Sequence, residues 1–351
     1  MSHLVETMAY AGQAPWHQLG NALPRKQPIE VWAEAAGMQW HIHETPVRYL
    51  ASDGDTSHAT VPGTLYGEAM EFPEQKVLYR SDTKAALSVV SQRYKVVQPQ
   101  EVLEFYRDLT EVAGYELKTA GVLKAGRRFW ALARTGQSTA LKGDDLVQGY
   151  LLLATSCDGS LATMAIPTTV RVVCNNTLAI ALQGAANAVK VPHSTHFNAQ
   201  QVKRQLGVAV GQWDGFMYQM RTLAERKVKT HEAMNFFLKV LCNPTGGNST
   251  ALTPALHAVS GLGSSRAVPA KGSLTNERAL QKAQMLYDGH GRGATKAAAQ
   301  GTAWGLLCAI TEYVDHEKRA RSRDNRLDSA WFGQGAAIKQ RALEQALQLV
   351  A

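Results

Sequence analysis

The stretch TSCDGSLATMAIPTTVRVVCNNTLAIAL, Thr155–Leu182, decides the fold. Its Asp158–Gly159 pair separates two apolar runs, which predicts a β-hairpin because glycine tolerates the positive φ that tight hairpin turns need. Pro167 lies within the second run and predicts a sheet edge or a bulge, since proline cannot donate to a strand ladder. The Asn175–Asn176 pair can cap the apolar run that follows, so we expect a helix at about 177–189.

Alternating apolar residues extend this antiparallel pattern on the N-terminal side. We expect strands at 76–80, 87–97, 115–123, 128–135, 147–155 and 160–166, and helices at 28–37 and 99–112. With the helix after the hairpin, the order from about 127 to 189 becomes strand, strand, strand, helix. The sequence therefore predicts an α+β fold, an antiparallel sheet with a β-β-β-α core and packed helices, in a mixed domain at 1–189.

The second half of the chain has helical spacing instead. Apolar residues recur at intervals of three and four residues, which predicts helices within 199–241, 274–287, 294–321 and 336–349. The residues at about 243–271 are rich in Gly, Pro, Ser and Thr, which predicts a mobile loop. We therefore expect a second, mostly helical and basic region at 190–351.

The charge of the chain is uneven. The net charge is +8, but residues 1–189 contain 16 Lys and Arg against 18 Asp and Glu, whereas residues 190–351 contain 21 against 11. A basic excess confined to one half favours a polyanionic partner, most often nucleic acid. A solvated basic surface without such a partner is the alternative interpretation.

Composition also bears on the compartment. The sequence has no run of about 18 apolar residues, so we expect no spanning helix and no membrane partner. The N-terminus lacks a basic segment followed by an apolar one, which argues against export. The cysteines at 157, 174, 242 and 308 are dispersed and form no CxxC pair, which is typical of reduced thiols in the cytoplasm.

Catalytic and metal-binding motifs are sparse. Cys157 stands at a turn without a recognised nucleophile signature, so we interpret it as a small structural residue. The histidines lack the paired spacings with cysteine of zinc sites, and we expect no metal and no cofactor. The run DGHGRG (288–293) lacks the Lys-Ser/Thr of a phosphate-binding P-loop. The alternative function is a small-molecule or nucleotide-processing enzyme, or a host-interaction protein, with a pocket near Trp16, His17 and Asp158.

Basic residues beside aromatic ones form the candidate nucleic-acid site. Guanidinium groups pair with phosphates, and aromatic rings stack on bases without sequence preference. Near the hairpin, we expect phosphate contacts and stacking surfaces from Arg127, Arg128, Phe129, Trp130, Arg134 and Arg171. In the helical region, we expect further phosphate contacts from Lys203, Arg204, Arg226, Lys227, Lys229, Arg319, Arg321 and Arg323. Each basic cluster taken alone also fits a solvated helix face, and the two aromatic residues also fit core positions.

Three blocks of sequence resemble a known family. APWHQLG (14–20), TSCDGSLATMAIPTTVRVVCNNTL (155–178) and GTAWGLLCAITEYVDH (301–316) resemble the phage/plasmid-like proteins of unknown function, domain of unknown function 932. That family usually has a His where this chain has Cys157, which further weakens a role for the thiol as a required nucleophile. The resemblance implies a phage or mobile-element setting and no particular activity.

The predicted β-β-β-α core also looks like the core of the ATP-independent single-strand-annealing proteins of the RecT, Red beta and Erf type, which is an analogy of architecture. Those proteins form rings or filaments that hold single-stranded DNA in a basic groove. The analogy implies a single-stranded DNA-binding and strand-annealing protein that uses no ATP and assembles as a homo-oligomer. It also implies a phage exonuclease or a host single-strand-binding protein as a further partner, in the cytoplasm of a bacterial host.

Overall fold

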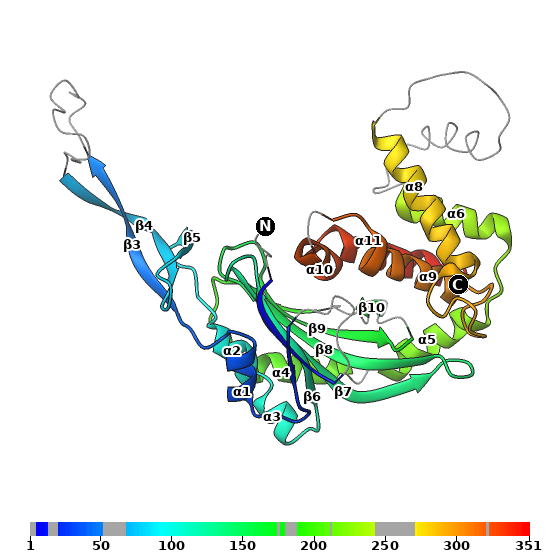
Figure 1. The fold of residues 1–351 in the computed structure, drawn as a ribbon, viewed down its shortest axis with the longest axis horizontal. Helices are drawn as coiled ribbons and strands as arrows, with labels where there is room; N and C mark the ends of the chain where they lie inside the picture. Colours follow the sequence, from blue (N-terminus) through cyan, green and yellow to red (C-terminus); the bar gives the residue numbers. More distant parts are fainter. Residues whose placement is uncertain are drawn as a thin grey trace.

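A curved, mostly antiparallel sheet forms the middle of the molecule (Figure 1). The computed structural model describes residues 5–12, 20–51, 68–173, 176–179, 188–210, 213–242, 271–320 and 323–351. The strand order is β10-β9-β8-β7-β6-β1-β2, with β11 also paired to β9, and only β1 and β2 run parallel. The strands are β1 (Val5–Ala11), β2 (Asn21–Leu23), β6 (Glu116–Leu123), β7 (Arg128–Ala140), β8 (Leu146–Ser156), β9 (Thr163–Arg171), β10 (Asn176–Ala179) and β11 (Val189–Val191).

The hairpin predicted at Asp158–Gly159 is confirmed. Strands β8 and β9 pair antiparallel without a register shift, and Gly159 in the turn between them has a φ of 72°. Pro167 lies inside β9, between the residues that pair with β11 and those that pair with β10. Within the described residues the outer side of β9 has no strand partner at Pro167, so the proline occupies the edge position that its missing N–H requires.

The prediction of a helix at about 177–189 is wrong for its first residues. Residues Asn176–Ala179 form β10, which pairs antiparallel with the end of β9. The carbonyl of Leu178 also accepts the hydroxyls of Thr168 and Thr169 from β9. A short apolar run fits a strand as well as a helix, and here pairing with β9 decides between them. Residues 180–187 lie outside the described part, so the described core continues from three strands to a fourth.

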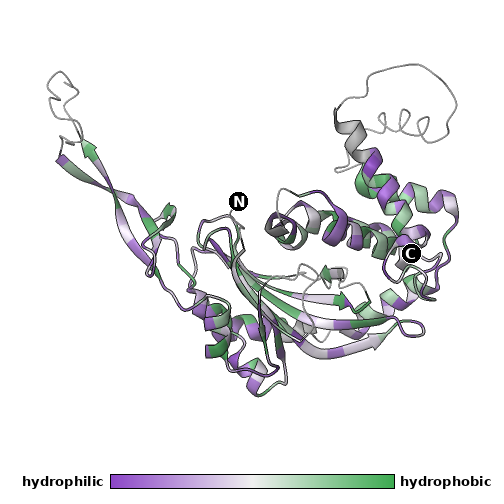
Figure 2. Ribbon diagram, viewed as in Figure 1, coloured by the Kyte–Doolittle hydropathy of each residue, from purple (hydrophilic) through white to green (hydrophobic). Residues whose placement is uncertain are grey.

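Helices cover both faces of the sheet. One face packs against α1 (Ile29–Ala35), α2 (Pro99–Glu104), α3 (Arg107–Glu111) and α4 (Ala199–Val210), and the other against α9 (Ala303–Glu312), α10 (Arg323–Phe332) and α11 (Gln334–Leu347). The single helix predicted at 99–112 is therefore two, broken at Phe105 and Tyr106. Tyr106 is fully buried, with its hydroxyl 2.9 Å from the carbonyl oxygen of Leu151. Hydrophobic residues gather along the central strands (Figure 2) because both of their faces are covered.

The C-terminal half is helical, as predicted, but is divided more finely. The run expected as one or two helices at 199–241 forms α4, α5 (Trp213–Glu225) and α6 (Thr230–Leu241). After residues 243–270, which lie outside the described part and include nearly all of the predicted mobile loop, come α8 (Lys271–Met285) and the π-helical turn η3 (Leu286–His290). A second π-helical turn, η4 (Tyr313–Glu317), follows α9. In the described segments we find no helix long and apolar enough to cross a membrane.

A separate three-stranded sheet forms an arm that projects from the body (Figure 1). Its strands are β3 (Ile42–Ala51), β4 (Glu68–Arg80) and β5 (Ala86–Ser91). Strand β5 pairs only with Gln75–Tyr79 of β4, so the outer part of the arm is a ribbon of two strands. The sequence predicted strands at 76–80, which is the inner end of β4, and at 87–97, which overlaps β5, but it did not predict β3 or the outer part of β4.

Candidate nucleic-acid interface

Cys157 is part of the scaffold of the β8–β9 turn. The side chain is 1% exposed, and its thiol donates to the carbonyl of Gly126, 3.5 Å away, in the neighbouring β6–β7 turn. Burial, together with the nearby Asp158 carboxylate, raises the pKa of the thiol to about 12. The thiol therefore stays protonated near neutral pH, and a protonated, buried sulfur is a poor nucleophile.

Arg128 fastens this turn to helix α10. Its guanidinium donates to the hydroxyl of Ser160 at 2.8 Å and forms an ion pair with Asp328. Ser160 in turn donates to the carboxylate of Asp158, which also accepts the Ser160 backbone N–H. Because Arg128 is 4% exposed and already paired, it does not present its charge to a phosphate in this structure.

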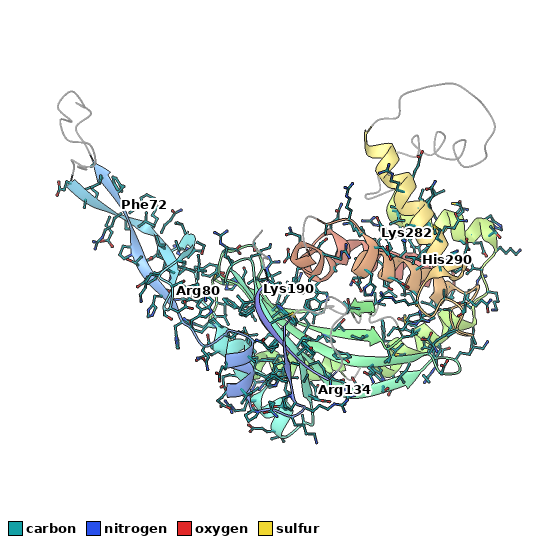
Figure 3. The ribbon with its side chains drawn as sticks, in the orientation of Figure 1. Phe72, Arg80, Arg134, Lys190, Lys282 and His290 are labelled. Atoms are coloured by element: carbon teal, nitrogen blue, oxygen red, sulfur yellow. The ribbon has the colours of Figure 1, made fainter. Side chains whose placement is uncertain are left out.

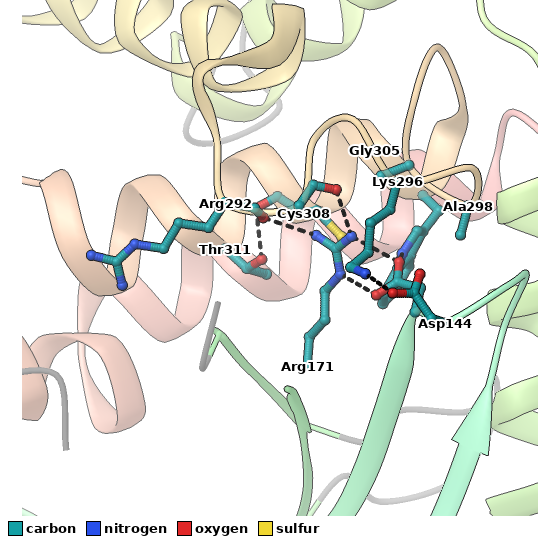
Figure 4. A network of polar contacts seen from close by, with 12 residues as sticks. Asp144, Arg171, Arg292, Lys296, Ala298, Gly305, Cys308 and Thr311 are labelled. Carbon is teal, nitrogen blue, oxygen red and sulfur yellow. Dashed lines mark hydrogen bonds and ion pairs between the residues drawn. The ribbon is translucent and has the colours of Figure 1, made fainter. Parts of the chain in front are cut away.

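Arg171 is held in the same way at the other end of the sheet (Figure 4). It makes two hydrogen bonds of 2.7 Å to the two carboxylate oxygens of Asp145, and one of 2.9 Å to the carbonyl of Gly293. The indole of Trp304 donates to the same carboxylate at 3.1 Å. Arg171 and Asp145 are both buried. We call the network of Arg171, Asp145, Gly293 and Trp304 the clamp, because it connects the sheet to the helical half.

The aromatic pair beside Arg128 belongs to the core. Phe129 is 0% and Trp130 2% exposed. Their side chains point to opposite faces of β7, where Phe129 packs in an edge contact with Trp40 and Trp130 with Trp331. Neither ring can stack on a base here, and the core alternative holds for both. Arg134, further along β7, pairs with Glu116 at 2.7 Å.

The cations predicted in the helical half are spread over several elements. Lys203 pairs with Asp108 at 3.0 Å, and Arg226 pairs with Glu232 at 2.7 Å. Four more of the predicted cations are exposed: Arg204, Lys227, Lys229 and Arg319. Arg321 and the side chain of Arg323 lie outside the described part. A role for these helical cations in phosphate binding stays a prediction.

A second group of cations lies at one end of the sheet. Of its members, only Arg127 was among the residues predicted from the sequence. The group, which we call the basic loop row, consists of Arg93, Lys95, Arg127 and Lys190; Figure 3 labels Lys190 and, at the inner end of the arm, Arg80. Arg93, Arg127 and Lys190 are exposed, and Lys95 is half-buried. No carboxylate of the described residues lies within 4 Å of their charged groups.

Backbone contacts bring these cations to the same end of the sheet. Arg127 precedes β7, and its carbonyl accepts the N–H of Cys157 at 2.9 Å. Lys190 lies on β11 and pairs with Met164 of β9, which pairs with Ala154 of β8, which pairs with Trp130 of β7. Three strand spacings, or about 14 Å, therefore separate Lys190 from β7.

Arg93 and Lys95 are anchored to this end by the residue between them. The hydroxyl of Tyr94 donates to the carbonyl of Ser156 at 2.8 Å, and its ring stacks on His193 at 4.4 Å. The His193 ring nitrogens lie 3.0 Å from the carbonyl oxygens of Lys95 and Leu161. The loops that carry the row are thus fixed by hydrogen bonds to the sheet, which holds the charges in place.

The glycine run of residues 288–293 is already occupied by a carboxylate of the chain itself. The backbone N–H of Arg292, in the glycine run, already donates to both oxygens of the Glu312 carboxylate at 3.0 Å, which would repel a phosphate there. No cluster of three or more metal-ligating side chains occurs in the described segments. His43 instead stacks on Tyr79. Trp16 and His17 of the predicted pocket lie outside the described part.

Two cavities in the described part are small. One, of about 60 Å³, lies between the sheet and α11 and is lined by Leu152, Leu178 and Lys339. The other, of about 180 Å³, lies between α1 and α2. Pockets for small-molecule substrates are usually about 300–1,000 Å³, so neither of these two supports the enzyme alternative.

The comparisons with known proteins give a family. The family model described as Domain of unknown function (DUF932) matches residues 86–331, which include β5 to β11 and the helices from α2 to nearly the end of α10. The resemblance noted in the sequence blocks is therefore confirmed, whereas the analogy to annealing proteins stays a prediction. No curated protein and no solved structure matches the chain.

Proposed function

Because the chain belongs to the DUF932 family, a family without a known function, we propose a function from its geometry: it binds single-stranded DNA along the basic loop row and anneals complementary strands without ATP. The row replaces the buried Arg128 and Arg171 as the phosphate contacts. Arg127 is retained from the sequence prediction, and Arg93, Lys95 and Lys190 are added.

One observation carries the proposal. Four cations from three separate segments of the chain converge at one end of the sheet, and no described carboxylate neutralises them. Keeping like charges together costs free energy unless an anion is bound there. A flexible single strand can follow a row of such cations, with its phosphates on the protein and its bases turned outward. Outward bases are free to pair with a second strand, which is the requirement for annealing.

The other features agree with binding rather than chemistry. The Cys157 thiol is protonated and buried, and the glycine run has an acidic side chain on its backbone N–H group. Phosphate contacts alone bind without sequence preference, so we expect similar affinity for oligonucleotides of different sequence.

The experiment measures affinity for a fluorescein-labelled oligothymidine by anisotropy, for wild type and for Arg127→Ala combined with Lys190→Ala. We expect the double variant to bind about tenfold more weakly or worse. We also expect the slope of log affinity against log salt to become shallower by about 1.4, since each single-strand phosphate contact contributes about 0.7. Annealing of two complementary oligonucleotides should slow in parallel.

The matched control lies at the other end of the same strand. Lys142, in the β7–β8 turn, is an exposed cation like Arg127, which precedes β7. Lys142→Ala should leave both affinity and salt slope as in wild type. Arg127→Ala is therefore also measured alone, and equal losses in Lys142→Ala and Arg127→Ala would show only a general effect of net charge and would remove the basic loop row from the proposal.

A further inference from the structure

The outer half of the arm carries its larger apolar side chains mainly on one face, which we call the apolar face, whereas the other face combines Arg48 and Glu71 with Leu50 and Ala69. Val47 pairs with Phe72, and Tyr49 pairs with Met70, so these four side chains share a face of the ribbon. On the opposite face Arg48 lies across from Glu71. A strand pair that alternates in this way is built to bury one face.

The apolar face is uncovered in the described structure. Tyr49 is 51%, Met70 40% and Phe72 38% exposed. An isolated two-stranded ribbon is at best marginally stable in water, and it needs a surface to pack on. The arm extends away from the described part of its own body (Figure 1), so none of the described elements of the body supplies that surface, and a second molecule can.

Charge selects the kind of surface. Glu68 lies on the apolar face with Tyr49 and Met70, and Glu71 and Glu74 are exposed nearby, whereas the described residues of the outer arm include the single cation Arg48. The outer arm is therefore acidic. Its complement is a basic surface that also exposes apolar side chains, because the partner must satisfy both the carboxylates and the rings.

Helix α8 offers such a surface on this same chain. Arg278, Gln281 and Met285 follow one another at three- and four-residue intervals on its exposed face, and Met285 is 47% exposed. Arg278 has no carboxylate partner within 4 Å among the described residues. Figure 3 shows Phe72 on the arm and Lys282 on α8 at opposite ends of the molecule.

We propose that the apolar face of the arm of one copy packs on the exposed face of α8 of a second copy, with Glu68 near Arg278. The two surfaces differ and lie at opposite ends of the chain, so the contact is head-to-tail. Repeated head-to-tail contacts close into a ring or continue as a filament. Pairing of two arms would bring two acidic surfaces together, which like-charge repulsion disfavours. The assembly does not depend on DNA binding.

The first test measures the mass of the assembly by sedimentation over a range of concentrations. Wild type should run well above the 38.2 kDa of one chain. Tyr49→Ser combined with Phe72→Ser should raise the concentration at half assembly at least tenfold. The control is Leu50→Ser, because Leu50 is 42% exposed on the opposite face of the same ribbon and should not matter. A single-chain mass for wild type at all concentrations would overturn the proposal.

A charge exchange identifies the partner surface. Glu68→Arg and Arg278→Glu should each weaken assembly, and the two combined in one chain should restore it, because every contact then has an Arg against a Glu again. If Arg278→Glu has no effect while the arm variants do, the arm packs elsewhere and the assignment to α8 is wrong. The circular dichroism spectrum should stay unchanged in all variants, since the substituted side chains are on the surface.

Discussion

Replacing Arg171 by Met tests whether the clamp is structural. The guanidinium is 3% exposed and its partner Asp145 is fully buried, with two hydrogen bonds of 2.7 Å between them. Met fills a similar volume but leaves the carboxylate uncompensated in the core. Removing one partner of a buried ion pair costs about 3–5 kcal/mol, a large part of the 5–15 kcal/mol by which domains are typically stable.

Urea unfolding followed by circular dichroism measures this loss. We expect Arg171→Met to lower the free energy of unfolding by about 3–5 kcal/mol. Asp145→Asn added to Arg171→Met should recover much of it, because no buried charge is then left alone. DNA affinity, measured where both variants are folded, should equal that of wild type.

A different result would refute the reasoning. If Arg171→Met costs less than about 1 kcal/mol and weakens DNA binding, Arg171 is a phosphate contact and the clamp has been misinterpreted. Lack of recovery in the Asp145→Asn double variant would show that the loss comes from packing against Trp304 or from the Gly293 carbonyl rather than from the stranded carboxylate.

Three further outcomes follow from the same structure. Cys157→Ser should lower the free energy of unfolding by about 1 kcal/mol or less at pH 7. Burial raises the pKa of the thiol in the folded protein to about 12 from 9.0, so the thiol of the unfolded chain loses its proton at a lower pH. The free energy of unfolding, measured in urea, should therefore fall more for wild type than for the Ser variant as the pH rises from 9 towards 12. Gly293→Ala should lower the free energy of unfolding by about 2–4 kcal/mol, because the φ of Gly293 is 70° and the new Cβ would lie 2.6 Å from Val173 Cγ1. Gly289→Ala has open space around the new Cβ and should cost only the backbone strain of about 1–2 kcal/mol. Phe129→Leu should lower thermal stability by about 1–2 kcal/mol and leave the anisotropy titration with DNA unchanged, since the ring is in the core; weaker DNA binding at unchanged stability would restore the stacking role.

The sequence was sufficient for the central hairpin and for most of the sheet. Asp158–Gly159 and the alternating runs on either side indicate the turn and its strands by local physics alone. The helix expected at 177–189 failed at its start because the four residues of β10, Asn176–Ala179, are too few to show a period of their own. Its conformation is set by β9, with which it pairs, and by Asp315, which accepts the backbone N–H of Thr177 at 2.8 Å.

The candidate site could be predicted less well. Arg128 and Arg171 look like free cations in the sequence, but their partners Asp328 and Asp145 are 200 and 26 residues away. Alternation could not identify Phe129 as buried, because helices cover both faces of the sheet. The other members of the basic loop row, the neighbours Arg93 and Lys95 and the distant Lys190, lie far from Arg127 along the chain, so only the strand order and the loop contacts bring them to it.

The salt dependence of wild-type binding to an oligothymidine tests the central claim most directly. Four phosphate contacts predict a log–log slope of about −3, and an affinity that falls by more than tenfold between about 50 and 200 mM salt. A slope near zero, or no binding at low salt, would contradict the account, because the basic loop row would then have no polyanion to hold.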